Sequence, residues 1–254
     1  MKITFLGTGT SMGIPMIGCN CSVCTSEDPK DKRLRTSVWI EIDNKHIVID
    51  AGIDFRQQAL RKNISRIDAV LFTHHHVDHI FGLDDLRAIT ILQKRPVEIY
   101  ANVETLENLK RVYPYVLNNN YCPSSVPTIN HTIIDENPFM VKGVQVLPIP
   151  LFHGDLPIFG FRLGNFAYCT DVSEVPMESY RLLKNLNILV LGALRHRPHP
   201  THFTLSEAVT IAKKIGAVKT YLVHMSHELS HSSMVSHLST DIQPAYDGLE
   251  IELI

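Results

Sequence analysis

The clustered histidines and acids of this sequence have the types and spacing of metal ligands. Fourteen histidines occur in 254 residues, and the densest cluster is THHHVDH at residues 73–79. In an extended chain, His74 and His76 project to the same side and can bind one ion. Asp78 and His79 follow and can face a second ion. Because imidazole nitrogen and carboxylate oxygen are ligands that Zn²⁺ accepts in open catalytic sites, this cluster predicts part of a two-ion centre.

Later segments supply the remaining ligands. His153 lies in PLFHGD, Asp171 in CTDV and His224 in LVHMSH, each at or just after an apolar run. His75 falls between two predicted ligands and should point away from the site. A single histidine at a strand end is more often hydrogen-bonded or solvated than a ligand. Seven such residues together nevertheless favour a dinuclear metal site.

Short buried strands must position these side chains. The runs IVIDAG, AVLFTHHH, AYCTD and TYLVH lead into Asp50, His74, Asp171 and His224. Their β-branched and apolar residues are typical of buried strands. Each run is therefore predicted to deliver a functional group from its C-terminal end.

Helical patterns alternate with these strands. Thr204, with Glu207 three residues later, predicts a capping box at the start of the last helix. The Asn-, Pro- and Ser-rich segment 118–138 is predicted to be a long surface loop, either bordering the active site or simply connecting two elements. The alternation, without a linker or repeat, predicts a single domain over residues 1–254. The helical patterns cover residues 55–62, 103–112, 177–186 and 205–215.

The charge balance and the N-terminus restrict the partners and the location. The formal net charge is −2 and no long basic tract occurs, so a general nucleic-acid binder is not favoured. The first apolar stretch is interrupted by Gly7 and is too short for a signal peptide. No run is long enough to span a bilayer. We therefore expect a cytoplasmic protein with no membrane partner.

Three cysteines form a second candidate metal site. Cys19, Cys21 and Cys24 lie close together among an odd total of five, which does not resemble a secreted disulfide framework. Their spacing gives three of the four ligands of a tetrahedral structural zinc, and the fourth must come from elsewhere. The alternative is a loop with three free thiols. Cys122 and Cys169 have no partners at ligand spacing and are expected to be ordinary residues.

The order of these motifs resembles the metallo-β-lactamase superfamily over nearly the whole chain. The segments GTGTSMGIP and HHHVDHIFG resemble the branch that includes the transfer-RNA 3′-processing nucleases and the PhnP-like cyclic phosphodiesterases. The resemblance implies an α/β fold, a four-layer αβ/βα sandwich, with both ions at the edge of two sheets. It also implies a homodimer.

The same resemblance implies a role for each residue. His74, His76 and His153 would bind the first catalytic ion, and Asp78, His79 and His224 the second, with Asp171 bridging the two. Asp50 would orient the metal loop by hydrogen bonds without binding metal. His227 would complete the structural zinc site with the three cysteines.

These expectations predict a metal-dependent phosphodiesterase that hydrolyses a small phosphodiester, cyclic esters among them, by a hydroxide bridging two ions. Both Zn²⁺ and Mn²⁺ suit the ligands. Asp78 is counted among the catalytic residues as well as the ligands. By resemblance, His202 is the candidate acid for the leaving oxygen, as an imidazolium, with His196 and His199 as competitors.

Several other functions share parts of this pattern. A transfer-RNA 3′-processing endonuclease uses the same chemistry, but no basic arm for RNA is evident. A thioesterase of the glyoxalase II type has the same metal loop, so the ligands alone do not exclude it. Because no export signal is evident, an exported antibiotic-degrading lactamase is not favoured. A di-iron redox protein typically carries Glu where this chain has His76, and an inactive scaffold should lack ligands.

Overall fold

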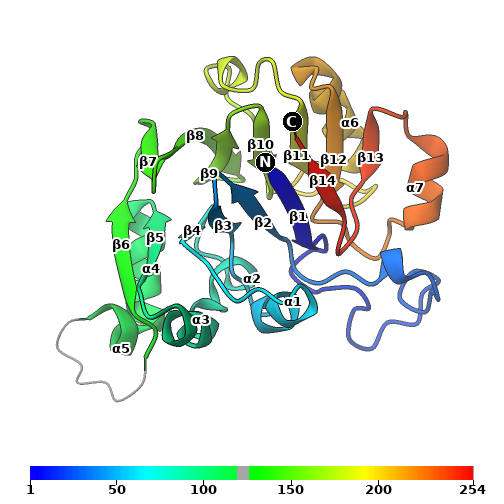
Figure 1. Ribbon diagram of the computed structural model, residues 1–254. Helices are drawn as coiled ribbons and strands as arrows, with labels where there is room; N and C mark the ends of the chain where they lie inside the picture. Colours follow the sequence, from blue (N-terminus) through cyan, green and yellow to red (C-terminus); the bar gives the residue numbers. More distant parts are fainter. Residues whose placement is uncertain (119–125, 254) are drawn as a thin grey trace.

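Two β-sheets packed face to face form the centre of this protein (Figure 1). The structure is a computed structural model that describes residues 1–118 and 126–253. Within these residues, each sheet has seven strands. The first sheet has the spatial order β14 (Glu250–Glu252), β1 (Lys2–Gly7), β2 (Ser37–Ile42), β3 (Lys45–Ile49), β4 (Ala69–Leu71), β5 (Val97–Ala101) and β6 (Ile129–Ile133).

The second sheet combines antiparallel and parallel strands. Strands β10, β11, β12 and β13 pair in parallel, whereas β7, β8, β9 and β10 pair antiparallel. Its spatial order is β13 (Ile242–Pro244), β12 (Lys219–Val223), β11 (Ile188–Gly192), β10 (Phe166–Cys169), β9 (Leu156–Leu163), β8 (Val144–His153) and β7 (Phe139–Val141).

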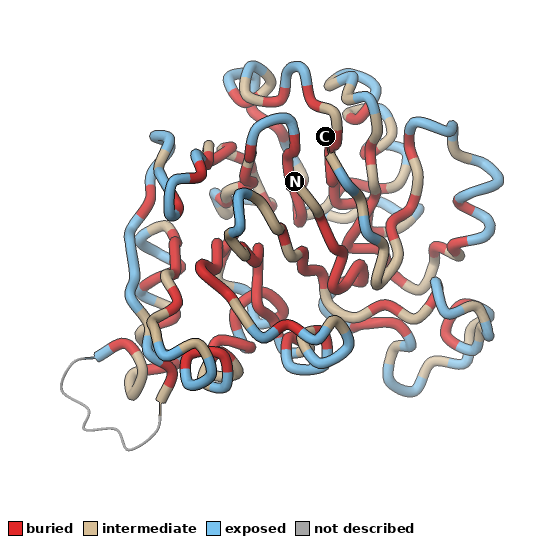
Figure 2. The backbone as a smooth tube through the Cα atoms, viewed as in Figure 1, coloured by how far each residue is buried: buried red, intermediate tan, exposed pale blue. Residues whose placement is uncertain are grey.

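Apolar side chains from both sheets form the central core. Phe5 and Ile49 of the first sheet belong to the same buried cluster as Phe161 and Tyr168 of the second. Figure 2 shows these strands as buried segments inside a shell of exposed turns and helices. Burial of this apolar area on two facing sheets holds the layers together. The sheets thereby bring their strand ends to one common edge.

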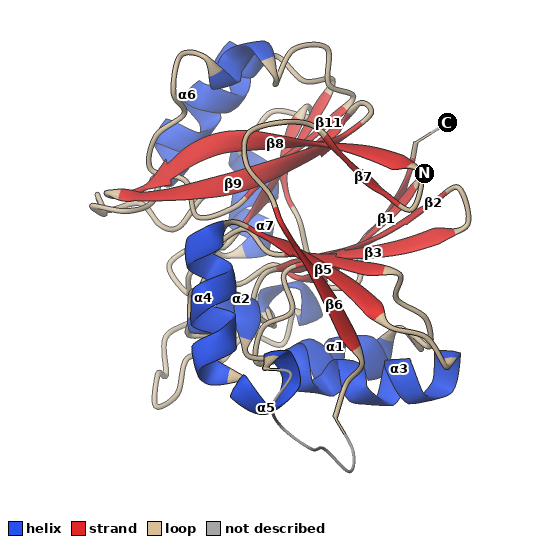
Figure 3. Ribbon diagram, turned by 90° about the vertical axis from the view of Figure 1, so that its left-hand side faces the viewer, coloured by secondary structure: helices blue, strands red, loops and turns tan. Residues whose placement is uncertain are grey.

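Helices cover the outer face of each sheet, which gives four layers (Figure 3). This arrangement confirms the predicted αβ/βα sandwich. The α-helices are α1 (Phe55–Arg61), α2 (Val77–Ile80), α3 (Leu86–Gln93), α4 (Val103–Val112), α5 (Pro114–Leu117), α6 (Leu205–Ile215) and α7 (His231–His237). The 3₁₀ turns are η1 (Pro29–Asp31), η2 (Leu83–Asp85) and η3 (Ser179–Arg181).

The predicted start of α6 is confirmed in atomic detail. The hydroxyl of Thr204 accepts from the backbone N–H of Glu207, and the carboxylate of Glu207 accepts from the backbone N–H of Thr204. These reciprocal bonds satisfy two donors that have no partner within the helix. The predicted helices at 55–62 and 103–112 are also present as α1 and α4.

The predicted helix at 177–186 is wrong. Only the 3₁₀ turn η3 forms there, and Asn185 adopts a left-handed backbone with φ 57°. The guanidinium of Arg162 donates to the carbonyl oxygens of Leu182 and Lys184, at 2.5 and 2.9 Å. These carbonyls are therefore held by a side chain of the sheet instead of by amides of a following helical turn.

The predicted loop at 118–138 is wrong in part. Strand β6 lies within it and pairs in parallel with β5 at the edge of the first sheet. The β-branched residues of INHTI suit a strand even though most of its side chains are exposed. The segment 119–125 of this prediction, which includes Cys122, lies outside the described residues.

Membrane crossing has no candidate element in the described part of the chain. None of its helices is both long enough and apolar enough to span a bilayer.

Candidate metal centre

The site residues stand at the C-terminal ends of buried strands, as the sequence predicts. Asp50 follows β3, Asp171 follows β10 and His224 follows β12. All three adopt the left-handed backbone region, with φ of 62°, 55° and 58°. This conformation is costly for residues other than glycine and clusters at functional sites. It turns the chain sharply at the point where each strand delivers its side chain.

The first group of candidate ligands is His74, His76 and His153. Their ligand atoms lie within 4.8 Å of one another. Nε2 of His74 lies 3.0 Å from Nδ1 of His76, close to the separation of about 3.3 Å for two nitrogens on one tetrahedral zinc. Nδ1 of His153 donates to the carbonyl oxygen of Thr201 at 2.7 Å, which leaves its Nε2 free to bind.

The second group contains Asp78, His79, Asp171 and His224, all buried. Nε2 of His79 lies 3.3 Å from Oδ2 of Asp78 and 3.5 Å from Oδ1 of Asp171. Nε2 of His224 lies 3.2 Å from the other oxygen of Asp171. The carboxylate of Asp171 thus has one oxygen toward each of these two histidines. The structure brings all seven predicted ligands together.

Unsatisfied polar atoms test whether these residues fit metal ions. Nε2 of His79 and both ring nitrogens of His224 are buried without a hydrogen-bond partner among the described residues. Burial alone would raise the pKa of Asp171, but the charges of His224 and His79 hold this pKa well below its usual value. A buried carboxylate among imidazoles with free lone pairs is the donor set of a divalent transition metal. The residues therefore fit such ions.

Asp50 organises the loop without facing the ligand cluster. Its carboxylate accepts from the backbone N–H of Thr73 at 2.9 Å, from the hydroxyl of Thr73 at 2.8 Å and from Nδ1 of His79 at 2.7 Å. The Thr73 hydroxyl, having given its proton to Asp50, accepts from Nδ1 of His74 at 3.0 Å. This relay orients the other nitrogen of both histidines toward the site.

Two residues of this network were missed from the sequence. Thr73 is part of the THHHVDH motif, but the motif alone did not lead to a predicted role for it. Its hydroxyl directly precedes the first ligand, His74, and this position could have indicated that Thr73 orients the ligand. The backbone carbonyl of Thr201, which holds His153, carries no sequence signal because any residue has one. His75 is absent from both ligand groups, as predicted.

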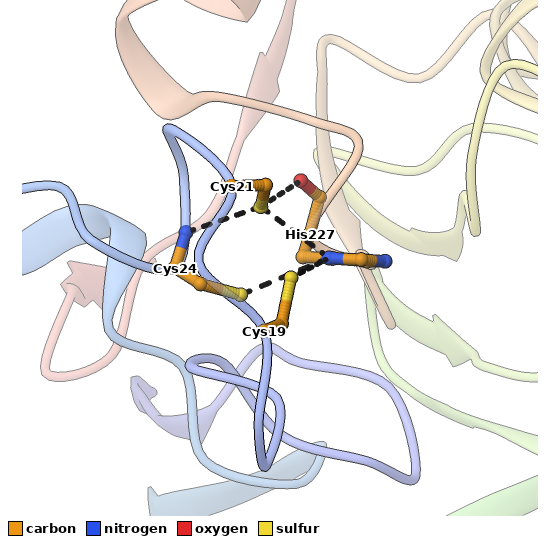
Figure 4. Close-up of side chains that lie close together, drawn as sticks. All are labelled: Cys19, Cys21, Cys24 and His227. Carbon is orange, nitrogen blue, oxygen red and sulfur yellow. Dashed lines mark hydrogen bonds between the residues drawn. The ribbon is translucent and has the colours of Figure 1, made fainter.

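The cysteine cluster is a separate group (Figure 4). Nδ1 of His227 lies 3.2, 3.4 and 3.7 Å from the sulfurs of Cys19, Cys21 and Cys24. A tetrahedral zinc with ordinary bond lengths would place nitrogen and sulfur about 3.6 Å apart. The backbone N–H of Cys24 lowers the pKa of the Cys21 thiol to about 6, which favours a thiolate. These four side chains therefore also fit a metal ion.

Replacing Cys24 by alanine should abolish metal binding at this cluster and loosen the loop, while metal binding by the histidine and aspartate groups is unchanged. If free zinc exceeds the dissociation constant about 100-fold, the lost binding corresponds to about 2.7 kcal/mol and lowers the midpoint of thermal unfolding by about 5 to 10 °C. Metal analysis and calorimetry of the holoenzyme measure both effects. Ser22→Ala, an exposed change in the same loop, is the control. Equal metal content in Cys24→Ala and wild type would contradict the assignment.

His202 is the histidine nearest to the cluster among the three candidates for the acid. Its ring centroid lies 4.5 Å from that of His153 and 4.8 Å from that of His224. His199 contacts His202, with ring centroids 5.0 Å apart, and His196 is exposed. Burial, with the nearby charge of His224, lowers the pKa of His202 to about 3. This pKa favours the neutral ring before substrate binds, whereas the acid role requires the imidazolium.

A family model described as a beta-lactamase superfamily domain matches residues 45–225. The chain belongs to this superfamily. A solved structure described as a new diphosphatase from the PhnP family is 43% identical, with a TM-score of 0.93, and the match covers 100% of this chain and 98% of the other. The predicted superfamily and the predicted fold are thus both confirmed.

Two curated relatives extend the comparison. A ribonuclease Z from Acaryochloris marina is 30% identical over 92% of this chain and 88% of its own length. An octanoyltransferase from Porphyromonas gingivalis is 40% identical over 98% of this chain, but the chain spans only 51% of that relative. Its name thus describes a protein about twice as long as the superfamily member. The predicted hydrolase class agrees with the diphosphatase and ribonuclease relatives.

Proposed function

We propose that this superfamily member is a dinuclear metal-dependent phosphodiesterase that hydrolyses small phosphodiesters. The observation that carries the proposal is the convergence of seven ligand-type side chains from both sheets at one edge. The likeness to the PhnP-family diphosphatase supports phosphorus rather than carbonyl carbon as the electrophile. Two ions, Zn²⁺ or Mn²⁺, would occupy this centre and one Zn²⁺ the cysteine cluster. A cytoplasmic location and a homodimer stay predictions.

The chain's own residues define how such a centre works. When bound, the ions would supply an activated water and neutralise the phosphoryl oxygens. His74, His76 and His153 would hold one ion, and Asp78, His79 and His224 the other. Asp171, which has an oxygen within 4.8 Å of a ring nitrogen of His153 and also lies beside His79 and His224, would serve both ions. Asp50 keeps the imidazoles in the tautomer that binds.

His202 is proposed to assist departure of the leaving oxygen. It is buried beside the centre and neutral before substrate binds. A phosphoryl anion next to the ring would favour its protonated form, so that the proton can pass to the leaving oxygen. This order places protonation of His202 after substrate binding.

An activity screen tests the proposed function. The metal-loaded enzyme is assayed with bis(p-nitrophenyl) phosphate, a 2′,3′-cyclic nucleotide and a thioester at equal concentration, with Zn²⁺ or Mn²⁺ added. We expect hydrolysis of at least one phosphodiester to exceed that of the thioester. A clear preference for the thioester would overturn the proposal in favour of a glyoxalase II-type activity.

A transfer-RNA 3′-processing nuclease is the second candidate, because the 30% identical ribonuclease Z covers most of both chains. The formal charge of −2 disfavours a long polyanion. Cleavage of a precursor transfer RNA faster than of the small diesters would favour this alternative.

Replacing His202 by alanine should lower turnover about 100- to 1,000-fold on a diester with a poor alkoxide leaving group, and less on a p-nitrophenyl ester, because only the former needs the proton. Both catalytic ions should remain, because the seven proposed ligands are all unchanged, although His202 lies within 4.8 Å of ligand atoms of His153 and Asp171. The measurement is kcat for both esters, with metal analysis. His196→Ala, at an exposed position, is the control. Full activity of His202→Ala on the poor leaving group would remove the assignment.

A further inference from the structure

One ligand of the candidate centre lacks the hydrogen bond that orients the others. Nδ1 of His74, His79 and His153 each has a hydrogen-bond partner, which leaves Nε2 of the ring for the site. Nε2 of His224 faces Asp171 at 3.2 Å, but Nδ1 of this ring is buried with no hydrogen-bond partner in the described part of the chain. The direction of the His224 ring therefore depends on where the backbone places it.

Arg33 holds the turn that follows His224 from inside the protein. The Arg33 side chain is one of the largest that are fully buried. Its Nη1 donates to the carbonyl oxygen of Ser226 at 3.2 Å, and its Nη2 donates to that of Leu229 at 2.7 Å. The backbone N–H of Leu229 also donates to the carbonyl oxygen of Ser226, which closes the turn. One guanidinium thus fixes both ends of the turn after the ligand.

An ion pair fixes Arg33 in its place. Nη2 of Arg33 also donates to Oδ1 of Asp31 at 3.2 Å, and both side chains are almost completely buried. The same oxygen of Asp31 accepts from the backbone N–H of His231, the first residue of α7, at 2.8 Å. The backbone of Arg33 pairs with that of Ile14. The ion pair therefore links the base of the N-terminal loop to the whole segment between β12 and α7.

Stability alone does not require this buried ion pair. Burial removes both charges from water, and apolar side chains of similar size in place of such a pair often leave the free energy of unfolding equal or higher. A guanidinium, however, has several donors in one rigid planar group, so it can hold two carbonyl oxygens at fixed positions. A metal ligand without a hydrogen-bond partner of its own, such as His224, needs a backbone that is held in this way.

We propose that Arg33 is a positioning residue for metal binding, which holds the turn after β12 so that His224 faces its ion. The inference rests on the proposed function for the nature of the site, but it concerns metal affinity and not the reaction. It also distinguishes Arg33 from the cysteine cluster. Arg33 contacts the turn directly, so His224 should depend on Arg33 even in Cys24→Ala, which lacks the metal of the cluster.

Titration of the metal-free protein with Co²⁺ in the presence of a competing chelator measures this effect. Thiolate ligands give Co²⁺ a charge-transfer absorption that imidazole and carboxylate ligands do not, so the cysteine cluster is followed separately from the centre. The main variant combines Asp31→Asn with Arg33→Met, which leaves no unpaired buried charge. We expect the affinity for one catalytic ion to fall about 10- to 100-fold, as after loss of a group that orients a ligand, while that for the other ion stays within about twofold.

Three further variants show whether the effect passes through His224. In a His224→Ala background, the same double change should alter the remaining catalytic affinity by less than about twofold, because the ligand that Arg33 positions is gone. Arg33→Lys keeps a charge beside Asp31 but not the planar group of donors, so its affinity should lie between those of the wild type and the double variant. Arg162→Met is the matched control, since this guanidinium also donates to backbone carbonyls but not to those of the turn after β12.

The outcomes separate this inference from the proposed function. Unchanged affinity for both catalytic ions in the double variant would overturn the role of Arg33, as would an equal fall for both ions or a fall that persists in the His224→Ala background. Calorimetry of each metal-free protein reports folding, and Arg33→Lys carries the same test if the double variant does not fold. The expected fall in affinity in a protein that hydrolyses no phosphodiester would support the role of Arg33 and refute the proposed function.

Discussion

Replacement of Asp171 by alanine should lower kcat/KM for bis(p-nitrophenyl) phosphate by at least about 1,000-fold, or about 4 kcal/mol of transition-state stabilisation. The carboxylate lies within 3.2 to 3.5 Å of His79 and His224, with one oxygen toward each. Its loss removes the only carboxylate proposed here to serve both ions. It also leaves the neighbouring imidazoles without a buried counter-charge.

Metal content shows whether that loss of activity comes from lost metal binding or occurs with both ions still bound. We expect Asp171→Ala to retain clearly less than two catalytic ions per chain, and Asp171→Asn to retain more because its carbonyl oxygen can still bind. Asp155→Ala changes an exposed acid two residues after His153 and serves as the control. Wild-type metal content together with wild-type kcat/KM in Asp171→Ala would show that the residue does not bridge the ions.

Asp50→Asn should weaken metal binding about 10- to 100-fold with little change in molecular shape. Two donors of Thr73 and one of His79 point at the carboxylate of Asp50. An asparagine side chain must direct its own NH₂ group at one of them, which breaks the relay to His74 or to His79. Competition with a chromophoric chelator measures the change in affinity.

Excess metal should restore part of the activity of Asp50→Asn, because its ligands are all present but less well oriented. Asp43→Asn is the matched control, since Asp43 lies in an exposed turn at φ 49°, a conformation that asparagine tolerates well. Metal affinity equal to that of the wild type would show that Asp50 does not orient the ligands.

The protonation of the site histidines also depends on groups that the sequence does not reveal. Thr201 holds His153 through a backbone oxygen, and the neutral state of His202 follows from burial beside two other imidazoles. From the sequence, His202 is expected to act on the leaving oxygen as an imidazolium, and residue type alone carries no information on how the surroundings shift its pKa. Desolvation of a charged group is a property of the packed site and not of residue type.

The spacing of neighbouring residues in the sequence was sufficient to predict several local features of this protein. The alternation in THHHVDH sets which histidines share a side, the three cysteines lie within one loop, and Thr204 with Glu207 specifies a helix start. These features depend on residues a few positions apart, whose relative directions follow from backbone geometry. The apolar runs before Asp50, His74, Asp171 and His224 were likewise sufficient to predict the strand ends.

Only the tertiary structure decided how distant groups meet. Packing of two sheets places His224 beside Asp171 and Asp78, sets Arg195 and His227 around one pocket, and turns three site residues into the left-handed region. In the folded protein, part of the expected loop forms strand β6, which pairs with β5. Where a helix was expected, Arg162 donates to backbone carbonyl oxygens instead. Such contacts arise because burial of apolar sheet faces fixes the positions of residues far apart in the chain, which local propensity does not encode.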